Sequence, residues 1–397
     1  MAADGTSAFA APGRRSPAVA PQTVCTTCPY CGVGCGVLAS PDTTSEGGRK
    51  LEVKGDHAHP ANFGRLCSKG SALGETVGLQ GRLLTPRIDG AEADWDSALD
   101  LVAARFQTAI RDHGPDSVAF YVSGQMLTED YYVANKLMKG FIGSANIDTN
   151  SRLCMASSVA GHRRAFGTDT VPGLYEDLEL ADLVVLTGSN LAWCHPVLYQ
   201  RLVAAKAARP AMKIVVIDPR RTATCDAADL HLAIAPGADA VLFNALLAEL
   251  AARGAVDAAY LDHVEGFDAA LAAARASDPA QTGLPAADLA AFLDLWCGTD
   301  KVVTVYSQGI NQSQSGTDKV NAILNCHLAT GRIGRPGMGP FSVTGQPNAM
   351  GGREVGGLAN MLACHLEIEN PAHRAAVQGF WNSPAMPAGP GLKAVDM

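Results

Sequence analysis

Four cysteines crowd together near the start of the chain, and they constrain its fold more than any other feature. They are Cys25, Cys28, Cys31 and Cys35, and the next cysteine is Cys67. The chain has 11 cysteines in 397 residues, and an odd number in a large protein does not fit a disulfide scaffold. Since the segment around these cysteines is too short to bury a core of its own, we expect a metal centre to hold it together.

The spacing of the thiols favours one kind of centre over another. Four thiolates can hold zinc or a [4Fe–4S] cluster. A zinc ribbon has two facing Cys-x2-Cys pairs, and the second pair is missing because Cys67 stands alone. We therefore expect a [4Fe–4S] cluster on Cys28, Cys31, Cys35 and Cys67, with zinc as the alternative. The run that begins at Cys25 also resembles bacterial ferredoxins but lacks the proline after their last cysteine, so Cys25 is a spare thiol of open role.

Beyond residue 81 the sequence alternates between strand and helix patterns. Short apolar runs predict buried strands, and longer segments with helical periodicity separate them. The expected strands are 117–122, 183–186, 213–217 and 301–306, and the expected helices are 98–111, 129–141, 196–208 and two more that end near 253 and 330. This order is typical of a mostly parallel sheet covered on both faces. We expect an α/β fold with a small β-rich metal domain and two α/β domains with mostly parallel, doubly wound sheets.

Composition limits the partners and the location. Lys plus Arg number 31 against 39 Asp plus Glu, and the net charge of −8 argues against a nucleic-acid partner. No apolar run approaches the roughly 18 residues of a membrane helix, so we expect no membrane partner. Residues 1–23 are rich in Ala, Pro and Gly, and prolines interrupt the stretch after Arg14-Arg15 where a twin-arginine export signal would be apolar. We therefore expect a disordered leader and a cytoplasmic location.

Three motifs in order carry a resemblance to a known family. They are Thr-Cys-Pro-Tyr-Cys-Gly-Val-Gly-Cys at 27–35, His-Pro-Ala-Asn-Phe-Gly-Arg-Leu-Cys-Ser-Lys-Gly at 59–70 and Asn-Ser-Arg-Leu-Cys-Met-Ala-Ser at 150–157. From residue 24 to its end the chain resembles the prokaryotic molybdopterin oxidoreductases, most closely the catalytic subunit of assimilatory nitrate reductases. Family members are considerably longer, so by resemblance the chain is C-terminally truncated and lacks the domain that closes over the second pterin.

The resemblance implies domain boundaries. Residues 24–81 would form the [4Fe–4S] domain. Residues 82–149 together with a returning segment, 336–397, would form one α/β domain. Residues 150–335 would form a Rossmann-like domain that binds molybdopterin guanine dinucleotide.

The resemblance also implies the cofactors, which are a [4Fe–4S] cluster and a molybdenum held by two molybdopterin guanine dinucleotides. Cys154 falls on the position of the protein's molybdenum ligand, and a soft thiolate suits such a metal. Lys69 would lie between the cluster and the pterin. The positions that match cofactor contacts are Gln125, Asn150, Gly188, Ser189, Asn190, His195, Asp218, Arg220, Thr222, Gly237, Asp239, Gln308, Gln312, Gly345 and Gln346, with Asp239 against a guanine edge.

The implied reaction is the reduction of nitrate to nitrite. The segment that begins at Thr344 resembles the substrate channel of nitrate reductases, with Met350 and Arg353 near the metal, and a guanidinium suits a trigonal oxyanion. The alternative for Arg353 is an ion pair with Glu354 or another carboxylate. Electrons would enter from an external donor, which is ferredoxin, flavodoxin or an NAD(P)H reductase subunit. Two other functions stay open: the alpha subunit of a formate dehydrogenase, and a non-catalytic electron-transfer or assembly subunit.

Overall fold

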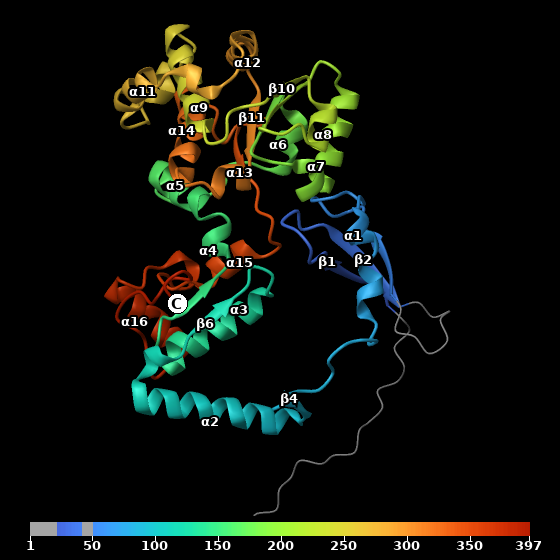
Figure 1. The fold of residues 1–397 in the computed structure, drawn as a ribbon, viewed down its shortest axis with the longest axis vertical. Coiled ribbons are helices and arrows are strands. Elements are labelled where there is room, and N and C mark those ends of the chain that lie inside the picture. The colour runs from blue at the N-terminus through green and yellow to red at the C-terminus, as the bar shows by residue number, and fades with distance from the viewer. Residues whose placement is uncertain (1–21, 42–50) are drawn as a thin grey trace, which may run out of the picture.

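The computed structural model describes residues 22–41 and 51–397. The expected leader therefore lies almost wholly outside the described residues. The chain forms an antiparallel sheet with the clustered cysteines, an upper α/β body and a lower body that carries both the long helix α2 and the C-terminal end (Figure 1). Within the described residues, no helix combines the length and the apolar character needed to cross a membrane.

The cysteine-bearing part is a three-stranded antiparallel sheet in the order β1-β2-β3. Its elements are β1 (Val24–Thr27), β2 (Gly36–Pro41), β3 (Leu51–Gly55), α1 (Ser68–Ser71) and η1 (Leu73–Val77). The loop between β1 and β2 is closed by a hydrogen bond from Cys28 N to Cys35 O, 2.8 Å long. Buried Asn62 ties the next loop to it, because its side chain accepts from Gly36 N and donates to Gly36 O and Arg65 O.

The upper body is built on a five-stranded, all-parallel sheet in the order β10-β9-β8-β11-β12. Its strands are β8 (Leu183–Thr187), β9 (Lys213–Ile217), β10 (Leu230–Leu232), β11 (Val302–Tyr306) and β12 (Gly339–Ser342). Every residue of β8, β11 and β12 is buried, which explains why β8 and β11 read as unbroken apolar runs. The expectation of a parallel sheet of the α/β class is confirmed.

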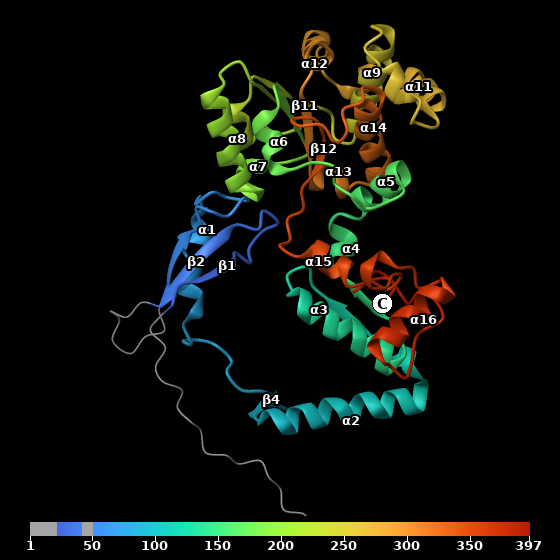
Figure 2. The same cartoon turned by 180° about the vertical axis from the view of Figure 1, so that it is seen from behind.

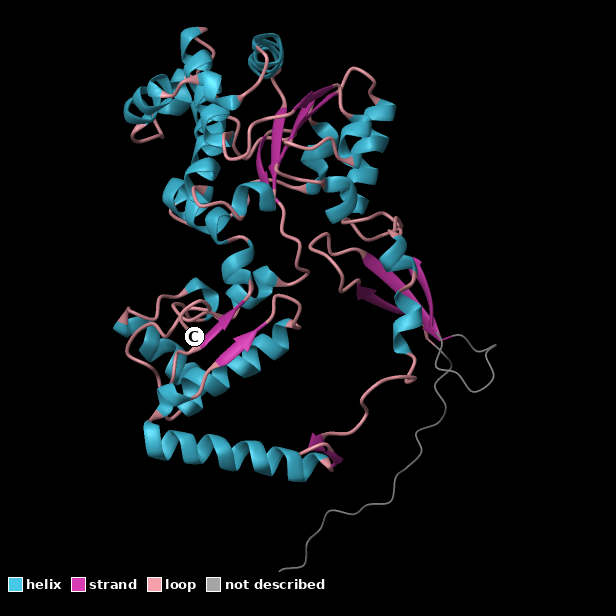
Figure 3. Ribbon diagram, in the orientation of Figure 1, coloured by secondary structure: helices cyan, strands magenta, loops and turns pink. Residues whose placement is uncertain are grey.

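Helices cover both faces of this sheet (Figures 2 and 3). One face packs against α6 (Tyr175–Leu180) and α8 (Pro196–Ala208). The opposite face packs against α9 (Asp239–Ala252), α12 (Ala286–Gly298) and α14 (Gly316–Ala329). The smaller helices of this body are α4 (Ser151–Cys154), α5 (Ala156–Phe166), α7 (Leu191–Cys194), η4 (Ala223–Ala227), α10 (Ala258–Leu261), α11 (Phe267–Ala276), η5 (Pro279–Thr282) and α13 (Gln308–Asn311).

The lower body has two two-stranded sheets, an antiparallel one of β4 and β5 and a parallel one of β6 and β7. Its strand β6 is shorter than the strand expected at 117–122. Its elements are β4 (Arg87–Ile88), β5 (Ala91–Glu92), α2 (Trp95–His113), η2 (Pro115–Ser117), β6 (Phe120–Val122), α3 (Thr128–Asn135), the π-helix η3 (Lys136–Ile142), β7 (Ile147–Thr149), α15 (Ala349–Glu354), η6 (Ala363–His365) and α16 (Pro371–Trp381). The helix α2 begins earlier than expected, because the Asp94 side chain accepts a 2.7 Å hydrogen bond from Ser97 N and caps it.

The returning segment leaves the upper body later than the resemblance implies. Residues 339–342 form β12, which pairs with β11 in the upper sheet. The chain then crosses to the lower body, where α15, η6 and α16 pack beside α3 and η3. We propose that the returning segment of the lower domain begins after Ser342 rather than at 336. We also propose that the domain boundaries after residues 81 and 149 lie where the resemblance implies.

One buried lysine ties the returning segment to the lower body. Lys139 lies in η3 with no exposed surface, and its Nζ donates to Gly356 O, Leu358 O and Met361 O at 2.7–2.8 Å. These three carbonyl groups belong to a loop that has little regular structure of its own. A single ammonium group therefore satisfies three backbone acceptors that would otherwise be buried without donors.

Lys139→Met is expected to lower the free energy of unfolding by about 3 kcal/mol, because the methionine keeps the length but removes all three donors. Urea unfolding followed by circular dichroism measures this change. The control is Lys136→Met, in the preceding turn, which is expected to change the value by less than about 0.5 kcal/mol. Equal effects of the two substitutions would contradict the role given to Lys139.

Candidate functional site

A cavity of about 600 Å³ lies at the carboxyl ends of the parallel strands. Such ends are where ligands of open α/β sheets bind. Nine of the residues expected to contact a cofactor line it together: Cys154, Gly188, Asn190, Asp218, Arg220, Gly237, Asp239, Gln308 and Gly345. They come from the segments that follow all five strands of the sheet and from α4. Only the folded sheet therefore brings them into one wall.

The cavity sits where the strand order changes direction. From β8 the chain moves to β9 on one side, and β11 later pairs on the other side. The two strand ends meet through glycine backbone: Gly309 N donates to Gly188 O at 3.0 Å, and a Cβ on Gly188 would lie 2.8 Å from Gly309 Cα. Gly188 also has a φ of +56°. Only glycine suits such a position, since both the space and the backbone angle disfavour a side chain.

The Cys154 thiol is held at the cavity wall by side-chain contacts. Gln308 Nε2 donates to Cys154 Sγ at 3.0 Å, and Thr344 Oγ1 lies 4.0 Å from the same sulfur. The hydroxyl group of Ser307 donates to Gln308 Oε1 and so fixes which end of the amide faces the sulfur. The sulfur is therefore oriented by residues that follow β11 and β12, far from it in the sequence.

Several buried polar atoms have no partner within the described part of the chain, in residues that are close in sequence to the cavity lining but do not line the cavity themselves. They are Ser189 Oγ, Thr222 Oγ1, His195 Nδ1 and both amide atoms of Asn311. The cavity lining itself combines glycine backbone with the charged side chains of Asp218, Arg220, Asp239 and Lys319. A large, polar, phosphate-bearing group such as a dinucleotide fits this set of donors and acceptors.

The four expected cluster ligands lie close enough to influence one another. Burial raises the pKa of the Cys28, Cys31 and Cys35 thiols, that of Cys35 to about 12, and neighbouring thiolates add to each rise. Cys67 is one of those neighbours for all three. The positive charge of Lys69 acts in the opposite direction on Cys28 and Cys31. Binding of a metal centre here would therefore release protons.

Among the described residues, no group of three His, Cys, Asp or Glu side chains has the arrangement that holds a single metal ion. Cys25 is exposed on β1 opposite Leu38 and is not among the thiols that shift the pKa of the others. The interpretation of Cys25 as a spare thiol stays a prediction.

The cysteine loop and the cavity meet at the segment after β12. Gly32 N donates to Gly345 O at 3.2 Å, and His195 Nε2 contacts Thr344 O at 2.6 Å. Burial lowers the pKa of His195, so the ring is neutral and donates through Nε2. The hydroxyl group of Tyr175 donates to Gly32 O and Val33 O and holds the cysteine loop from its other side.

A second cavity, of about 410 Å³, contains the arginine expected to meet the substrate. Arg353 is buried and its Nε lies 3.1 Å from Asp169 Oδ2, so it pairs with a carboxylate that the sequence did not single out. Burial lowers the pKa of Arg353, and Asp169 opposes that shift. Arg152, two residues before Cys154, lines the same cavity and is held by Asp148 at 3.0 Å. Met350 is exposed and lines neither cavity.

Other expected residues have local partners instead of facing the cavity. The Asn150 side chain accepts from Gly124 N, and Gln346 Oε1 accepts from the Ser151 hydroxyl group. Gln125 and Gln312 are exposed side chains outside the cavity lining. Sequence reasoning missed Lys319, which does line it. No local motif marks Lys319, because its importance depends on contact with a residue from another helix.

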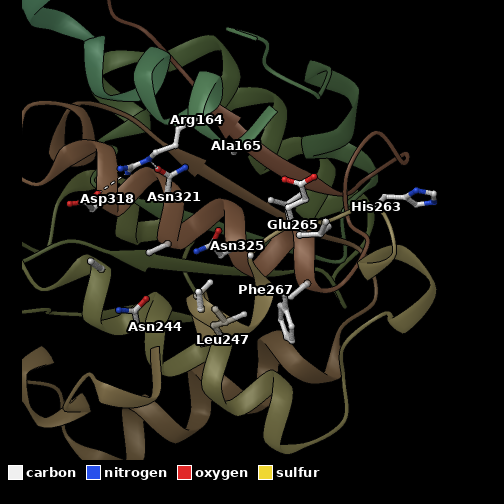
Figure 4. Close-up of a pocket in the computed structure, with 18 residues that line it drawn as sticks. Arg164, Ala165, Asn244, Leu247, His263, Glu265, Phe267, Asp318, Asn321 and Asn325 are labelled. Atoms are coloured by element: carbon white, nitrogen blue, oxygen red, sulfur yellow. Dashed lines mark hydrogen bonds and ion pairs between the residues drawn. The ribbon is translucent and has the colours of Figure 1, made fainter. Parts of the chain in front are cut away.

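Another cavity, of about 930 Å³, lies elsewhere in the upper body (Figure 4). It opens between α5, α9, α11 and α14, and it contains none of the expected site residues. Its polar rim is already partnered, since Arg164 pairs with Asp318 at 2.7 Å and also bonds Asn321. Its chemistry does not connect it with the cysteine-bearing cavity.

Family models match nearly the whole chain. Residues 21–78 match the molybdopterin oxidoreductase Fe4S4 domain, and residues 82–395 match molybdopterin oxidoreductase. Together the two family descriptions name the cofactors expected from the motifs, a [4Fe–4S] cluster and molybdopterin.

Among curated proteins, the nitrate reductase of Klebsiella oxytoca is 57% identical over 94% of this chain, and that of Shewanella frigidimarina is 51% identical over 95%. A periplasmic nitrate reductase of Desulfovibrio desulfuricans is 39% identical over 90% of the chain. The chain spans 42% and 41% of the lengths of the first two relatives.

A solved structure shares the fold at low sequence identity. Acetylene hydratase from Pelobacter acetylenicus superposes with a TM-score of 0.66 at 20% identity, over 77% of this chain and 42% of that one. This likeness supports the architecture and says nothing about the reaction.

Gly188→Ala is expected to lower the thermal unfolding midpoint by about 4 °C or more, because the new methyl group collides with the Gly309 backbone and the residue must keep a positive φ. The matched control is Gly345→Ala, at the same cavity, where a Cβ would meet nothing within 4 Å. Differential scanning calorimetry compares the two. A midpoint for Gly188→Ala as high as that of the control would show that the strand ends are not in contact.

Proposed function

The chain belongs to the molybdopterin oxidoreductase family, and on this premise we propose that it forms the cluster- and dinucleotide-binding part of an assimilatory nitrate reductase that converts nitrate to nitrite. The observation that carries the proposal is the position of Cys154, which lines a strand-end cavity together with eight other expected cofactor contacts. The two relatives named nitrate reductase, more than half identical over most of the chain, support the choice of substrate.

The [4Fe–4S] cluster is assigned to Cys28, Cys31, Cys35 and Cys67. Their mutual electrostatic influence supports a common centre, and the lack of a second Cys-x2-Cys pair in the sequence favours a [4Fe–4S] cluster over one zinc ion. Lys69 lies within electrostatic reach of two of these thiols. The Lys69 ammonium group would offset negative charge as electrons pass. We propose that Lys69 lies between the cluster and the pterin.

The dinucleotide and its molybdenum are assigned to the 600 Å³ cavity. Cys154 would ligate the metal, Gly188 and Gly237 would allow close approach of the backbone, and Asp218 and Arg220 would hold ribose or phosphate. Ser189, Asn190 and Thr222 would add hydrogen bonds to the dinucleotide, and His195 would hold the Thr344 carbonyl beside it. When bound, the molybdenum supplies two-electron oxygen-atom transfer, and the cluster supplies single electrons.

Nitrate would reach the metal past the second cavity. Two arginines, the buried Arg353 and the partly exposed Arg152, line it and give an anion a positive surface, while Asp148 and Asp169 hold their guanidinium groups in place. The reaction takes two electrons and two protons, so that nitrate becomes nitrite and water. The chain's own part is to attract the anion, orient it and keep the route to Cys154 narrow. Met350 lines neither cavity, and in this proposal it lies only near the entrance through which nitrate would pass.

The alternatives differ in measurable ways. A formate dehydrogenase would reduce a dye with formate and leave nitrate unchanged, and a non-catalytic subunit would bind iron but no molybdenum. A periplasmic relative is also similar, so the assimilatory role and the cytoplasmic location rest on the resemblance. The external donor in this proposal is ferredoxin, flavodoxin or an NAD(P)H reductase subunit.

Cys35→Ser is expected to reduce bound iron from about four atoms per chain to less than about one, because a buried serine is a poor ligand for the cluster. Iron is measured by mass spectrometry on protein purified without oxygen. Cys25→Ser is the control and is expected to keep the iron. Equal loss of iron in both variants would contradict this ligand set and favour a ferredoxin-like one.

Cys154→Ala is expected to lower nitrite production by about a hundredfold or more, with reduced viologen as electron donor, because the metal loses its protein ligand. The spectroscopic signal of the reduced cluster is expected to stay the same. Cys297→Ala, on α12 away from both cavities, serves as the control. Normal nitrite production by Cys154→Ala would end the assignment.

A further inference from the structure

Two opposite charges lie side by side in the wall of the dinucleotide cavity. Asp239 is the first residue of α9, and Lys319 lies in the first turn of α14. Their side chains are 10% and 3% exposed, and Lys319 Nζ is 2.7 Å from Asp239 Oδ2. Both residues line the cavity. In the described part of the chain this is the only ion pair that either side chain makes.

Packing alone does not account for this pair. Removing two charges from water costs several kcal/mol each, and well-packed apolar residues often replace a buried ion pair without loss of stability. Lys319 is also at the end of its helix where the backbone dipole disfavours a cation. A lysine that meets both penalties and still lines a cavity needs another reason for its place.

The pair has the hydrogen-bonding pattern of one purine base. Guanine presents a carbonyl acceptor, O6, beside two N–H donors at N1 and N2. A carboxylate accepts from two adjacent donors, and an ammonium group donates to the neighbouring acceptor. Adenine presents the reverse order, a donor at N6 beside an acceptor at N1. Its amino group would therefore face the ammonium group, and the lone pair on its N1 would face the carboxylate.

We infer that Lys319 acts with Asp239 to select guanine over adenine in this cavity. Asp239 accepts from N1–H and N2–H, while Lys319 donates to O6 and holds the carboxylate in position. The inference rests on the proposed function, in which the cavity holds a guanine dinucleotide. It adds Lys319, a residue outside every motif of the sequence, as a determinant of which base is bound.

The experiment uses the whole chain produced in a strain that cannot make molybdopterin, so that the cavity is free. Guanosine, inosine and adenosine diphosphates are the probes, and isothermal titration gives each dissociation constant. The wild-type chain is expected to bind the guanosine form about tenfold or more tighter than the adenosine form. The inosine form, which lacks the N2 amine, is expected to fall between them.

Lys319→Met is expected to reduce the guanosine preference to about threefold or less, and Lys319→Arg is expected to restore most of it because arginine keeps the donor and the charge. The control is Lys213→Met. Lys213 also pairs with an aspartate, Asp229 at 3.4 Å, but at the opposite, amino end of β9. It is expected to leave all three dissociation constants unchanged.

The outcomes separate the inference from its premise. A guanosine preference that survives Lys319→Met would overturn the inference and leave the pair as a brace between α9 and α14. Equal binding of guanosine and adenosine diphosphates by the wild-type chain would also overturn it, even if every variant failed to fold. Failure of all three probes to bind the wild-type chain would instead contradict the placement of the dinucleotide in this cavity.

Discussion

The backbone of Thr344 and Gly345 is the point on which the arrangement of the site depends. Gly345 O accepts from Gly32 N in the cysteine loop, and Thr344 O accepts from His195 after β8. Thr344 Oγ1 lies 4.0 Å from the Cys154 sulfur. A Cβ on Gly32 would collide with Thr344 O, so the loop can approach only because that residue is glycine. One short segment thus brings the cluster thiols and the expected metal ligand together.

The parallel sheet supplies the rest of the geometry. Because all five strands run in the same direction, the loops after them gather at one edge, and the change of direction between β8 and β11 opens the cavity there. The sheet is buried on both faces, so its strand ends are rigid supports for polar loops. The two metal centres of the proposal therefore rest on one structural support and not on separate mobile parts.

The sequence predicted the elements whose signal is local. The helix at 196–208 and the strand at 213–217 have the expected bounds, since each has its own periodicity and clear ends. Nine cavity residues were predicted through motifs, which mark loops after strands. The strand β12 was missed because its four residues, Gly-Pro-Phe-Ser, lie in a glycine-rich stretch without an apolar run. The pairs of Arg353 with Asp169 and of Lys319 with Asp239 join distant segments, and no local pattern predicts them.

The most direct test is the magnetic interaction between the two proposed centres in the wild-type protein. The chain is purified without oxygen and poised so that molybdenum is in its paramagnetic state, with the cluster first oxidised and then reduced. Because Thr344 and Gly345 join the two sites, the molybdenum signal is expected to broaden or split when the cluster is reduced. A molybdenum signal that does not change while a reduced-cluster signal is present would contradict the account, as would protein without iron.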